Sequence, residues 1–308
     1  HGSISGLGRI RGMTAFGAYI NEASLANEEV FDEIKARCSG PGARIIADTN
    51  PDNPEHWLLK DYINKESAGI LNFHFQLDDN TFLDERYKRN IKESTPSGMF
   101  YDRNIKGLWV SGEGVIYPDF DRKVHVIAPD RVKGMVFDRY LAGVDWGWEH
   151  WGAIVVIGVK DKAYYIIEEH ASKYVYIKGW IKIAKDIIEQ YGNIPFYCDP
   201  ARPEHVAAFQ QAGIQAYNGN NRVLSGIEAI ATLMKTKQFF VTYSQMPRFR
   251  DEIYRYIWKK NTGEPLKEND DVMCAIRYGI YSDMTVNETQ QTPEYRQKSA
   301  NRLRRMLR

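Results

Sequence analysis

Several features that define other protein classes are scarce or missing in this sequence of 308 residues. Its three cysteines, Cys38, Cys198 and Cys274, are far apart and form no Cys-x-x-Cys pair, which argues against a disulfide framework and against a structural zinc site. A reducing compartment is the natural setting for such a chain. No apolar run of about 18 residues is present, so we expect no membrane span. A signal-peptide pattern is also missing.

Neither sign of charge predominates, with 41 basic residues against 40 acidic ones, so the global balance indicates no partner. The hydrophobic content of 43% is enough for a real core, and the length suits one large domain or two ordinary ones. The first residue is His1 and not methionine, so we expect that the true start of the protein lies upstream.

The first part of the chain has the pattern strand, helix, strand. Apolar residues 15–20 lead into Asn21-Glu22, a helix is predicted over residues 28–38, and apolar residues 43–47 lead into Asp48 and Asn50. Both predicted strands therefore end in polar residues, and in an open α/β sheet ligands bind at that edge.

A second pattern begins near residue 136, after a connection with irregular strand over residues 111–135. Three antiparallel strands are predicted first, at residues 140–146, 152–159 and 163–168, with a tight turn at Asp161-Lys162. The elements expected after them are a helix at 177–191, a strand at 195–198, a helix at 203–212, a strand at 214–217, a helix at 224–234, a strand at 239–242, and helices at 248–258 and 270–281. This order predicts an α/β protein with an RNase H-like mixed sheet, three antiparallel strands followed by parallel ones, flanked by helices.

Three acidic segments carry the most chemistry. Asp145 and Asp199 each follow a short apolar strand, and Asp270 and Asp271 come at the start of the last predicted helix. A single aspartate in such a place usually forms a turn or caps a helix. In the predicted topology, however, the first strand is central, the strand ending at Asp199 lies beside it, and the last helix leans across their ends. Asp145, Asp199 and Asp271 would then converge, and Mg²⁺ or Mn²⁺ would relieve their repulsion, as in two-metal phosphodiester hydrolysis.

Aromatic side chains crowd the segment directly after Asp145. They fit either a turn that packs its own rings or a rim beside a substrate groove. The residues are Trp146, Trp148, His150 and Trp151. Glu168, which ends the third strand, is expected to be an exposed salt-bridge partner, with a role as an outer acid of the site as the alternative.

The ordered set of motifs resembles the large terminase subunit of tailed bacteriophages, in its PBSX-like branch. In that family an ATPase motor drives viral DNA into a capsid, and a C-terminal RNase H/RuvC-like nuclease cuts the DNA concatemer. Residues 10–23 are similar to the strand that carries the Walker B acids, residues 49–57 to the motif that couples hydrolysis to movement, and residues 97–117 to the stretch leading into the nuclease. The three acidic segments match the nuclease itself.

The resemblance implies four parts. Residues 1–110 correspond to the distal part of a P-loop-type α/β ATPase domain, 111–135 to a connection, 136–284 to the nuclease domain, and 285–308 to a basic tail. The tail is either solvated or an arm that touches nucleic acid or a partner subunit.

This sequence departs from the family pattern in three places. No Gly-x-x-x-x-Gly-Lys-Ser/Thr segment occurs, so the phosphate-binding loop is expected upstream, and this chain alone should hydrolyse ATP poorly. The Walker B Asp-Glu reads Asn21-Glu22, in which Glu22 matches the acid that orients the attacking water. In the late helix Cys274 replaces an acid, and a thiol is a poor ligand for Mg²⁺. Residues three apart share a helix face, so Asp271 is expected to supply the missing carboxylate in preference to Asp270.

The resemblance also implies roles and partners. Asp145, Asp199, Asp271 and Glu22 would be catalytic, Asp270 would be a further metal ligand, and Asn21, Glu22 and Asn50 would contact nucleotide. The cofactors would be two Mg²⁺ or Mn²⁺ ions, and ATP in the complete protein. Expected partners are double-stranded DNA, the small terminase subunit, the portal protein of the procapsid and other copies of the chain on the portal, in the host cytoplasm and without a membrane. The expected phosphate contacts are Lys173, Lys178, Arg202 and Arg222.

Other functions remain open at this point. A DNA-binding or assembly module with a weakened nuclease site is motivated by Cys274. A RuvC-like junction resolvase is disfavoured by the motor-like residues 10–57, and a pure ATPase fragment by the missing phosphate loop.

Overall fold

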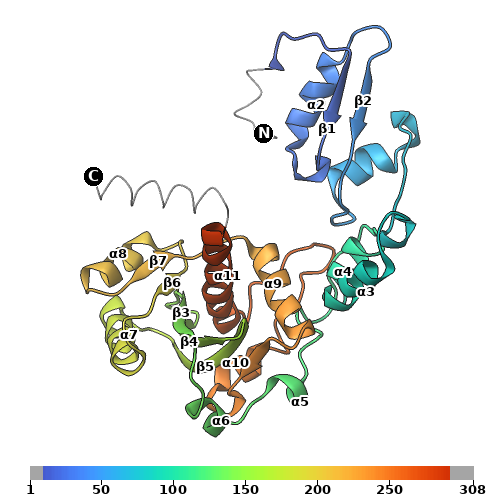
Figure 1. Ribbon diagram of the computed structural model, residues 1–308. Helices are drawn as coiled ribbons and strands as arrows, with labels where there is room; N and C mark the ends of the chain where they lie inside the picture. The colour runs from blue at the N-terminus through green and yellow to red at the C-terminus, as the bar shows by residue number, and fades with distance from the viewer. Residues whose placement is uncertain (1–9, 292–308) are drawn as a thin grey trace, which may run out of the picture. The chain divides into compact units, whose positions relative to one another are not determined.

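The computed structural model describes residues 10–291, and the chain separates into two compact units (Figure 1). Unit 1 consists of His1–Gly114 together with Trp258–Pro265, and unit 2 consists of Val115–Ile257 and Leu266–Arg308. Within the described residues, no helix combines the length and the apolar character needed to cross a bilayer.

Unit 1 contains the predicted strand, helix and strand. The parallel strands β1 (Gly17–Ile20) and β2 (Arg44–Ala47) pair in register and are joined by α2 (Glu28–Arg37). The helix begins where the Asn27 side chain accepts a hydrogen bond of 2.9 Å from the Glu29 amide, a favourable N-cap. Further elements of this unit are η2 (Ala23–Leu25), a π-helix η3 (Leu58–Ile63), η4 (Glu66–Ala68), η5 (Leu77–Asp79), α3 (Glu85–Ser94) and α4 (Met99–Asn104).

Unit 2 is built on a six-stranded sheet in the order β7-β6-β3-β4-β5-β8. The strands are β3 (Arg139–Asp145), β4 (Gly152–Lys160), β5 (Ala163–Ser172), β6 (Phe196–Cys198), β7 (Ala216–Asn218) and β8 (Phe239–Val241). Strands β3, β4 and β5 are antiparallel, and the other neighbours pair in parallel. The turn between β4 and β5 holds Asp161 and Lys162 at φ of 50° and 66°. The RNase H-like mixed sheet predicted from the sequence is therefore confirmed.

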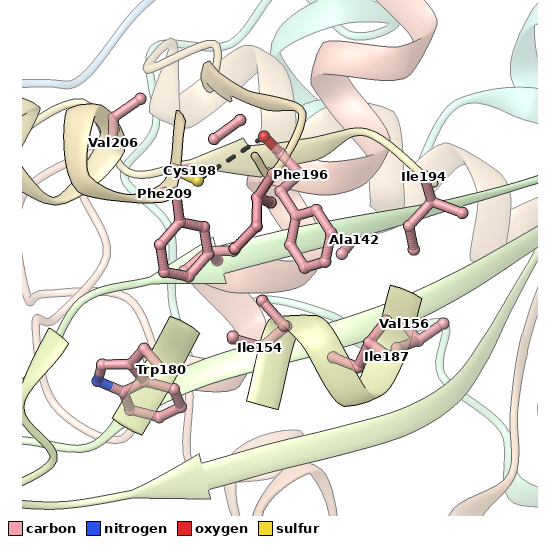
Figure 2. Close-up of a cluster of buried hydrophobic side chains, with 14 residues drawn as sticks. Ala142, Ile154, Val156, Trp180, Ile187, Ile194, Phe196, Cys198, Val206 and Phe209 are labelled. Atoms are coloured by element: carbon pink, nitrogen blue, oxygen red, sulfur yellow. Dashed lines mark hydrogen bonds between the residues drawn. The ribbon is translucent and has the colours of Figure 1, made fainter. Parts of the chain in front are cut away.

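Helices cover both faces of this sheet. They are α5 (Arg122–His125), α6 (Pro129–Lys133), α7 (Ile177–Tyr191), α8 (Pro203–Gln211), α9 (Val223–Lys235), α10 (Pro247–Glu252) and α11 (Asp271–Gln291), with a 3-10 turn η6 (Tyr243–Gln245). On one face, α7 and α8 enclose an apolar core; Figure 2 shows Trp180 and Ile187 of α7 close to Ile154 and Val156 of β4. On the other face, α11 packs across β3, β4 and β6.

A close backbone approach seats α11 on the sheet. A Cβ atom added at Gly143 of β3 would lie 1.9 Å from the carbonyl oxygen of Ala275, and Gly143 also contacts Gly279 one turn later. Only glycine fits at Gly143 without moving the helix, so this residue fixes the height of α11 above β3.

Three expectations about elements were wrong. The connection at residues 111–135 contains helices α5 and α6, with only isolated bridges at Val115 and Val126, because Asp121 accepts a hydrogen bond from the Lys123 amide and Pro129 opens α6. The helix predicted over residues 248–258 ends at Glu252, since Ile257 pairs with Val115 in an extended segment.

The third error concerns the last helix. It was expected to end at residue 281, yet α11 continues to Gln291, because no proline interrupts it and Gly279 is held against Gly143. The first residues of the expected basic tail are thus part of α11, and residues 292–308 lie outside the described part of the chain.

Candidate active site

The ends of two neighbouring strands bring Asp145 and Asp199 together. Val144 is the register partner of Cys198 in the parallel pair β3 and β6, and the Asp199 amide donates a hydrogen bond of 2.9 Å to the Val144 carbonyl. Both Val144 and Cys198 point into the core beneath α7 and α8. Because side chains alternate along a strand, the two aspartates point to the opposite face, where α11 lies. The strand neighbours are those expected from the sequence.

The amino end of α11 adds two more carboxylates, Asp270 and Asp271. Burial raises the pKa of Asp145 well above its ordinary value, and the negative charges of Asp199, Asp271 and Asp270 raise it further. The Arg277 guanidinium partly offsets this by lowering the same pKa. The four carboxylates therefore share one electrostatic environment, in which burial and like charge both disfavour Asp145 as an anion.

Asp199 is held by fixed hydrogen bonds. Its Oδ1 accepts from the Tyr278 hydroxyl of α11 and from the Ala201 amide, each at 3.0 Å. Its carbonyl oxygen accepts from the indole Nε1 of Trp146 at 3.1 Å. These contacts orient the carboxylate from the strand end, the helix and the following loop.

Asp271 is held instead by an ion pair. The Arg248 Nη2 lies 3.2 Å from its Oδ2, and the Arg248 Nε lies 2.8 Å from Glu252. Glu252 is 0% exposed and accepts hydrogen bonds from the first amides of α11, those of Val272 at 2.8 Å and Met273 at 3.1 Å. Burial raises the pKa of Glu252 to about 8, although these amides and Arg248 oppose the shift. Arg248 and Glu252 thus fix the start of the helix that carries the acids.

Cys274 and Arg277 line the same end of α11. The Cys274 thiol lies 3.6 Å from Asp270 Oδ2 as a weak donor, and the Arg277 Nη2 lies 3.8 Å from the sulfur. Arg277 is 3% exposed, and its Nε and Nη1 have no hydrogen-bond partner among residues 10–291. A buried guanidinium beside several carboxylates supplies them with positive charge.

The chemistry of the donor set suits a hard divalent cation, because carboxylate oxygen is the ligand that Mg²⁺ prefers. Within residues 10–291, however, no three His, Cys, Asp or Glu side chains are arranged so that they could hold a metal ion together. The ion pair with Arg248 gives Asp271 a different partner.

Two glutamates of β5 differ in role. Glu168 accepts from the Tyr191 hydroxyl and lies 2.8 Å from His170 Nε2, which fits the salt-bridge interpretation of that residue, although both partners are half-buried. Glu169, which was not predicted as a site residue, accepts from the Arg248 and Phe249 amides at 2.6 and 2.9 Å and so orients the start of α10.

The aromatic residues after Asp145 were predicted either to pack within a turn or to form a rim beside a substrate groove, and they differ in their burial. Trp146 is partly buried against the core, with its ring centroid 5.1 Å from those of both His205 and Phe209. Trp148 is exposed, and Trp151 is half-buried beneath the Arg248 guanidinium at 5.1 Å. The loop itself is tight, because a Cβ at Gly147 would lie 2.2 Å from the Trp151 carbonyl oxygen.

In unit 1 the polar ends of β1 and β2 also meet. Glu22 has a left-handed backbone with φ of 53°, and its amide donates a bond of 2.7 Å to Asp48. The Asn50 side-chain amide lies 3.3 Å from both carboxylate oxygens of Glu22, whereas Asn21 is exposed. Asp48, which was not predicted as a site residue, also accepts from the Tyr19 hydroxyl. Its position directly after the second strand was the available signal.

Comparison with known proteins gives matches in sequence and in structure. The family model described as phage terminase large subunit matches residues 9–104. Among solved structures, the large terminase of a thermophilic bacteriophage (crystal form 2) matches with a TM-score of 0.81 and 27% identity, over 92% of this chain and 72% of that chain. The same large terminase in complex with ADP matches with a TM-score of 0.78 and 28% identity, over 88% of this chain and 70% of that one. A search of the curated proteins gives no match.

By fold, this protein thus has an RNase H-like α/β unit, unit 2, preceded by unit 1, which is part of a motor-type α/β domain. The resemblance to the large terminase subunit of bacteriophages is confirmed, by sequence over residues 9–104 and by structure over 92% of the chain. The PBSX-like branch stays a prediction.

Proposed function

We propose that this chain is the distal motor segment and the nuclease of a phage DNA-packaging enzyme, and that unit 2 cuts concatemeric double-stranded DNA in a divalent-metal-dependent reaction. The observation that carries the proposal is the pairing of Asp145 and Asp199 at adjacent strand ends under α11, with Asp270 and Asp271 in the same electrostatic environment. The confirmed likeness to large terminases supports it.

In this proposal Asp145, Asp199 and Asp271 would hold the cations. When bound, two Mg²⁺ or Mn²⁺ ions would activate a water and stabilise the leaving oxygen of the phosphodiester. Tyr278 orients Asp199 through its hydrogen bond, and Arg248, which holds Asp271 in an ion pair, would have to release that carboxylate when a cation binds. Asp270 is the alternative third ligand, because the Cys274 thiol beside it is only a weak hydrogen-bond donor.

The motor role requires residues that this sequence does not contain. The large terminase of the thermophilic bacteriophage has been solved with ADP and with ATP-gamma-S. By analogy, Glu22 would orient the attacking water and Asn50 would sense the nucleotide through Glu22, with Asn21 beside them. ATP hydrolysis would need a phosphate-binding loop from outside this sequence.

The partners follow from the same proposal. Double-stranded DNA would be held through its phosphates, with Lys173, Lys178, Arg202 and Arg222 as exposed cations available for contact. The small terminase subunit, the portal protein and further copies of the chain would complete the packaging machine in the host cytoplasm.

A second function is favoured by a specific observation. The Arg248–Asp271 ion pair and Cys274 fit a DNA-binding or assembly module whose nuclease site is weakened. Such a module would bind duplex DNA and leave it intact. The likeness of unit 1 to a terminase motor argues against a RuvC-like junction resolvase.

Supercoiled plasmid separates these functions. With Mg²⁺ or Mn²⁺, the wild-type chain should nick and linearise the plasmid, EDTA should stop the reaction, and Asp145→Asn should lower the rate by about a hundredfold or more. Asp186→Asn removes the same charge from the exposed side of α7 and should leave the rate unchanged. Binding without cutting by the wild type would favour the second function.

A further inference from the structure

Three exposed aromatic rings gather where two loops of unit 2 meet. Trp148 follows β3, and Tyr174 and Tyr176 follow β5. The Trp148 ring centroid lies 4.7 Å from that of Tyr176 and 5.8 Å from that of Tyr174. The Tyr174 amide donates a hydrogen bond of 3.0 Å to the Trp148 carbonyl. Residues 26 and 28 positions apart in the chain thus form one cluster, which we call the aromatic platform.

Packing alone does not account for the aromatic platform. Tyr174 is 61% exposed and Tyr176 73%, so most of the surface of these two residues faces water, and Trp148 is 42% exposed. By contrast Trp146, in the same loop, is partly buried against the apolar core beneath α7 and α8. A contiguous exposed patch of aromatic surface marks a binding site more often than a scattered single ring does.

Tyr174, a member of the aromatic platform, has a strained backbone conformation. Its φ is 58°, in the left-handed region that aromatic residues rarely adopt. The hydrogen bond to Trp148 is one of the contacts that hold it there. Strain of this kind persists where the surroundings fix a residue, and it is frequent in ligand-binding segments.

The surroundings of the aromatic platform suit nucleic acid. Lys173, next to Tyr174, is exposed and its Nζ lies 5.8 Å from the Trp151 ring. The same ring contacts Arg248, which holds Asp271 of the acid cluster. The loop that carries Trp148 begins directly after Asp145. The aromatic platform and the carboxylates therefore lie at the same edge of the sheet. Cations with adjacent aromatic faces bind the phosphates and the bases of a single strand.

We propose that Trp148, Tyr174 and Tyr176 stack on an unpaired nucleobase beside the cleaved phosphodiester. Paired bases inside a duplex offer no free face, so the platform would act on a frayed end, a gap or a locally opened strand. Lys173 would contact the neighbouring phosphate. This inference rests on the proposed nuclease function, because it places the unpaired base next to the site of cutting.

The test compares two DNA ligands of equal duplex length, one blunt and one with a short single-stranded tail, by fluorescence anisotropy in EDTA. Wild type should bind the tailed ligand about tenfold more tightly than the blunt one. Trp148→Ala with Tyr176→Ala should reduce that ratio to about one, whereas Trp148→Phe with Tyr176→Phe should retain most of it. Tyr254→Ala, which removes a tyrosine of unit 2 that is 48% exposed, serves as the matched control and should keep the full ratio.

Thermal unfolding of each variant verifies that the fold is intact, as expected for exposed positions. Equal binding of both ligands by the wild type, or an unchanged ratio in the double alanine variant, would overturn the proposal. Plasmid cleavage in Mn²⁺ is scored separately. If the wild type does not cut but shows a tail preference that the alanine variant loses, the stacking on an unpaired base stands, and its place beside a cleaved phosphodiester fails together with the nuclease proposal.

Discussion

At the scale of single residues, Asp145 is a partly buried carboxylate among others of its own sign. Burial and three neighbouring carboxylates all disfavour its charge, and Arg277 compensates only in part. In the absence of a cation, this arrangement is expected to lower the stability of unit 2. Function and stability therefore make opposite demands on the same side chain.

Asp145→Asn should accordingly make the protein more stable in EDTA, by about 1 kcal/mol, because it removes a repelled charge at nearly constant size. Millimolar Mg²⁺ should stabilise the wild type and leave this variant unchanged, since only the wild type has the full set of acids for the ion. Urea unfolding with and without Mg²⁺ measures both effects, and Asp186→Asn is the control. A variant less stable than wild type in EDTA would contradict the electrostatic interpretation.

Glu168 is a carboxylate whose pKa is shifted in the opposite direction from that of Asp145. Hydrogen bonding from His170 lowers its pKa below the usual 4.5, with a further contribution from Tyr191 and with burial opposing both. A lowered pKa means that the carboxylate contributes stability above its unfolded pKa and that this contribution is lost as pH falls through the folded pKa.

The free energy of unfolding of the wild type should therefore fall more steeply below about pH 4.5 than that of Glu168→Gln. Denaturant titrations at several pH values between about 3 and 7 give the two curves. Glu189→Gln, at an exposed position of α7, should follow the wild-type curve. Parallel acid limbs for wild type and Glu168→Gln would show that the ion pair adds nothing.

At the scale of elements, α11 links the acids to the sheet. Gly143→Ala would force a Cβ to within 1.9 Å of the Ala275 carbonyl oxygen, so α11 must move away from β3. We expect a loss of about 3 kcal/mol in unfolding free energy, the upper part of the range for overpacking, together with weaker cleavage. Gly134→Ala is the matched control, because its Cβ would meet nothing closer than 3.9 Å and its φ is −88°. Equal stability of the two variants in urea would refute the close seating of α11.

Elements were predictable where local pattern and tertiary context agree. The antiparallel strands β3 to β5 and the amphipathic α7 follow from periodicity and from the Asp161-Lys162 turn. The early end of α10 did not, because Ile257 pairs with Val115, which lies far away in the sequence. Short helices such as α5 and α6 also escape a periodicity argument, since they span barely one turn.

The candidate site was predictable to a similar extent. Asp145 and Asp199 stand at strand ends, and strand order is enough to bring them together. Arg248 and Glu252 give no such signal, because their partners Asp271, Val272 and Met273 lie about 20 residues later and are met only in the folded chain. The fold, and not the spacing in the sequence, therefore decides which basic residue pairs with which carboxylate.

At the scale of the whole molecule, the chain consists of two units, each with its own buried residues. We expect unfolding in two transitions, because each unit can lose its core cooperatively. Mg²⁺ should raise the midpoint of the unit 2 transition alone. Asp48→Ala, which removes the acceptor of the Glu22 amide, should lower the unit 1 transition alone. Differential scanning calorimetry resolves the two, and a single transition that both changes shift together would argue for one cooperative block.

The close seat of α11 has a consequence for how this protein can change. Asp271, Ala275 and Gly279 follow one another at intervals of four residues along one side of the helix, and the latter two rest on Gly143. The contact of Ala275 with Gly143 therefore lies one helical turn from Asp271, and this separation is fixed by the helix. One residue inserted between Asp271 and Ala275 would rotate Asp270 and Asp271 by about 100° around the helix axis. Substitutions on the sheet would not reverse that rotation. A change in the length of this segment would therefore be harder to accommodate than a substitution at one of its exposed positions.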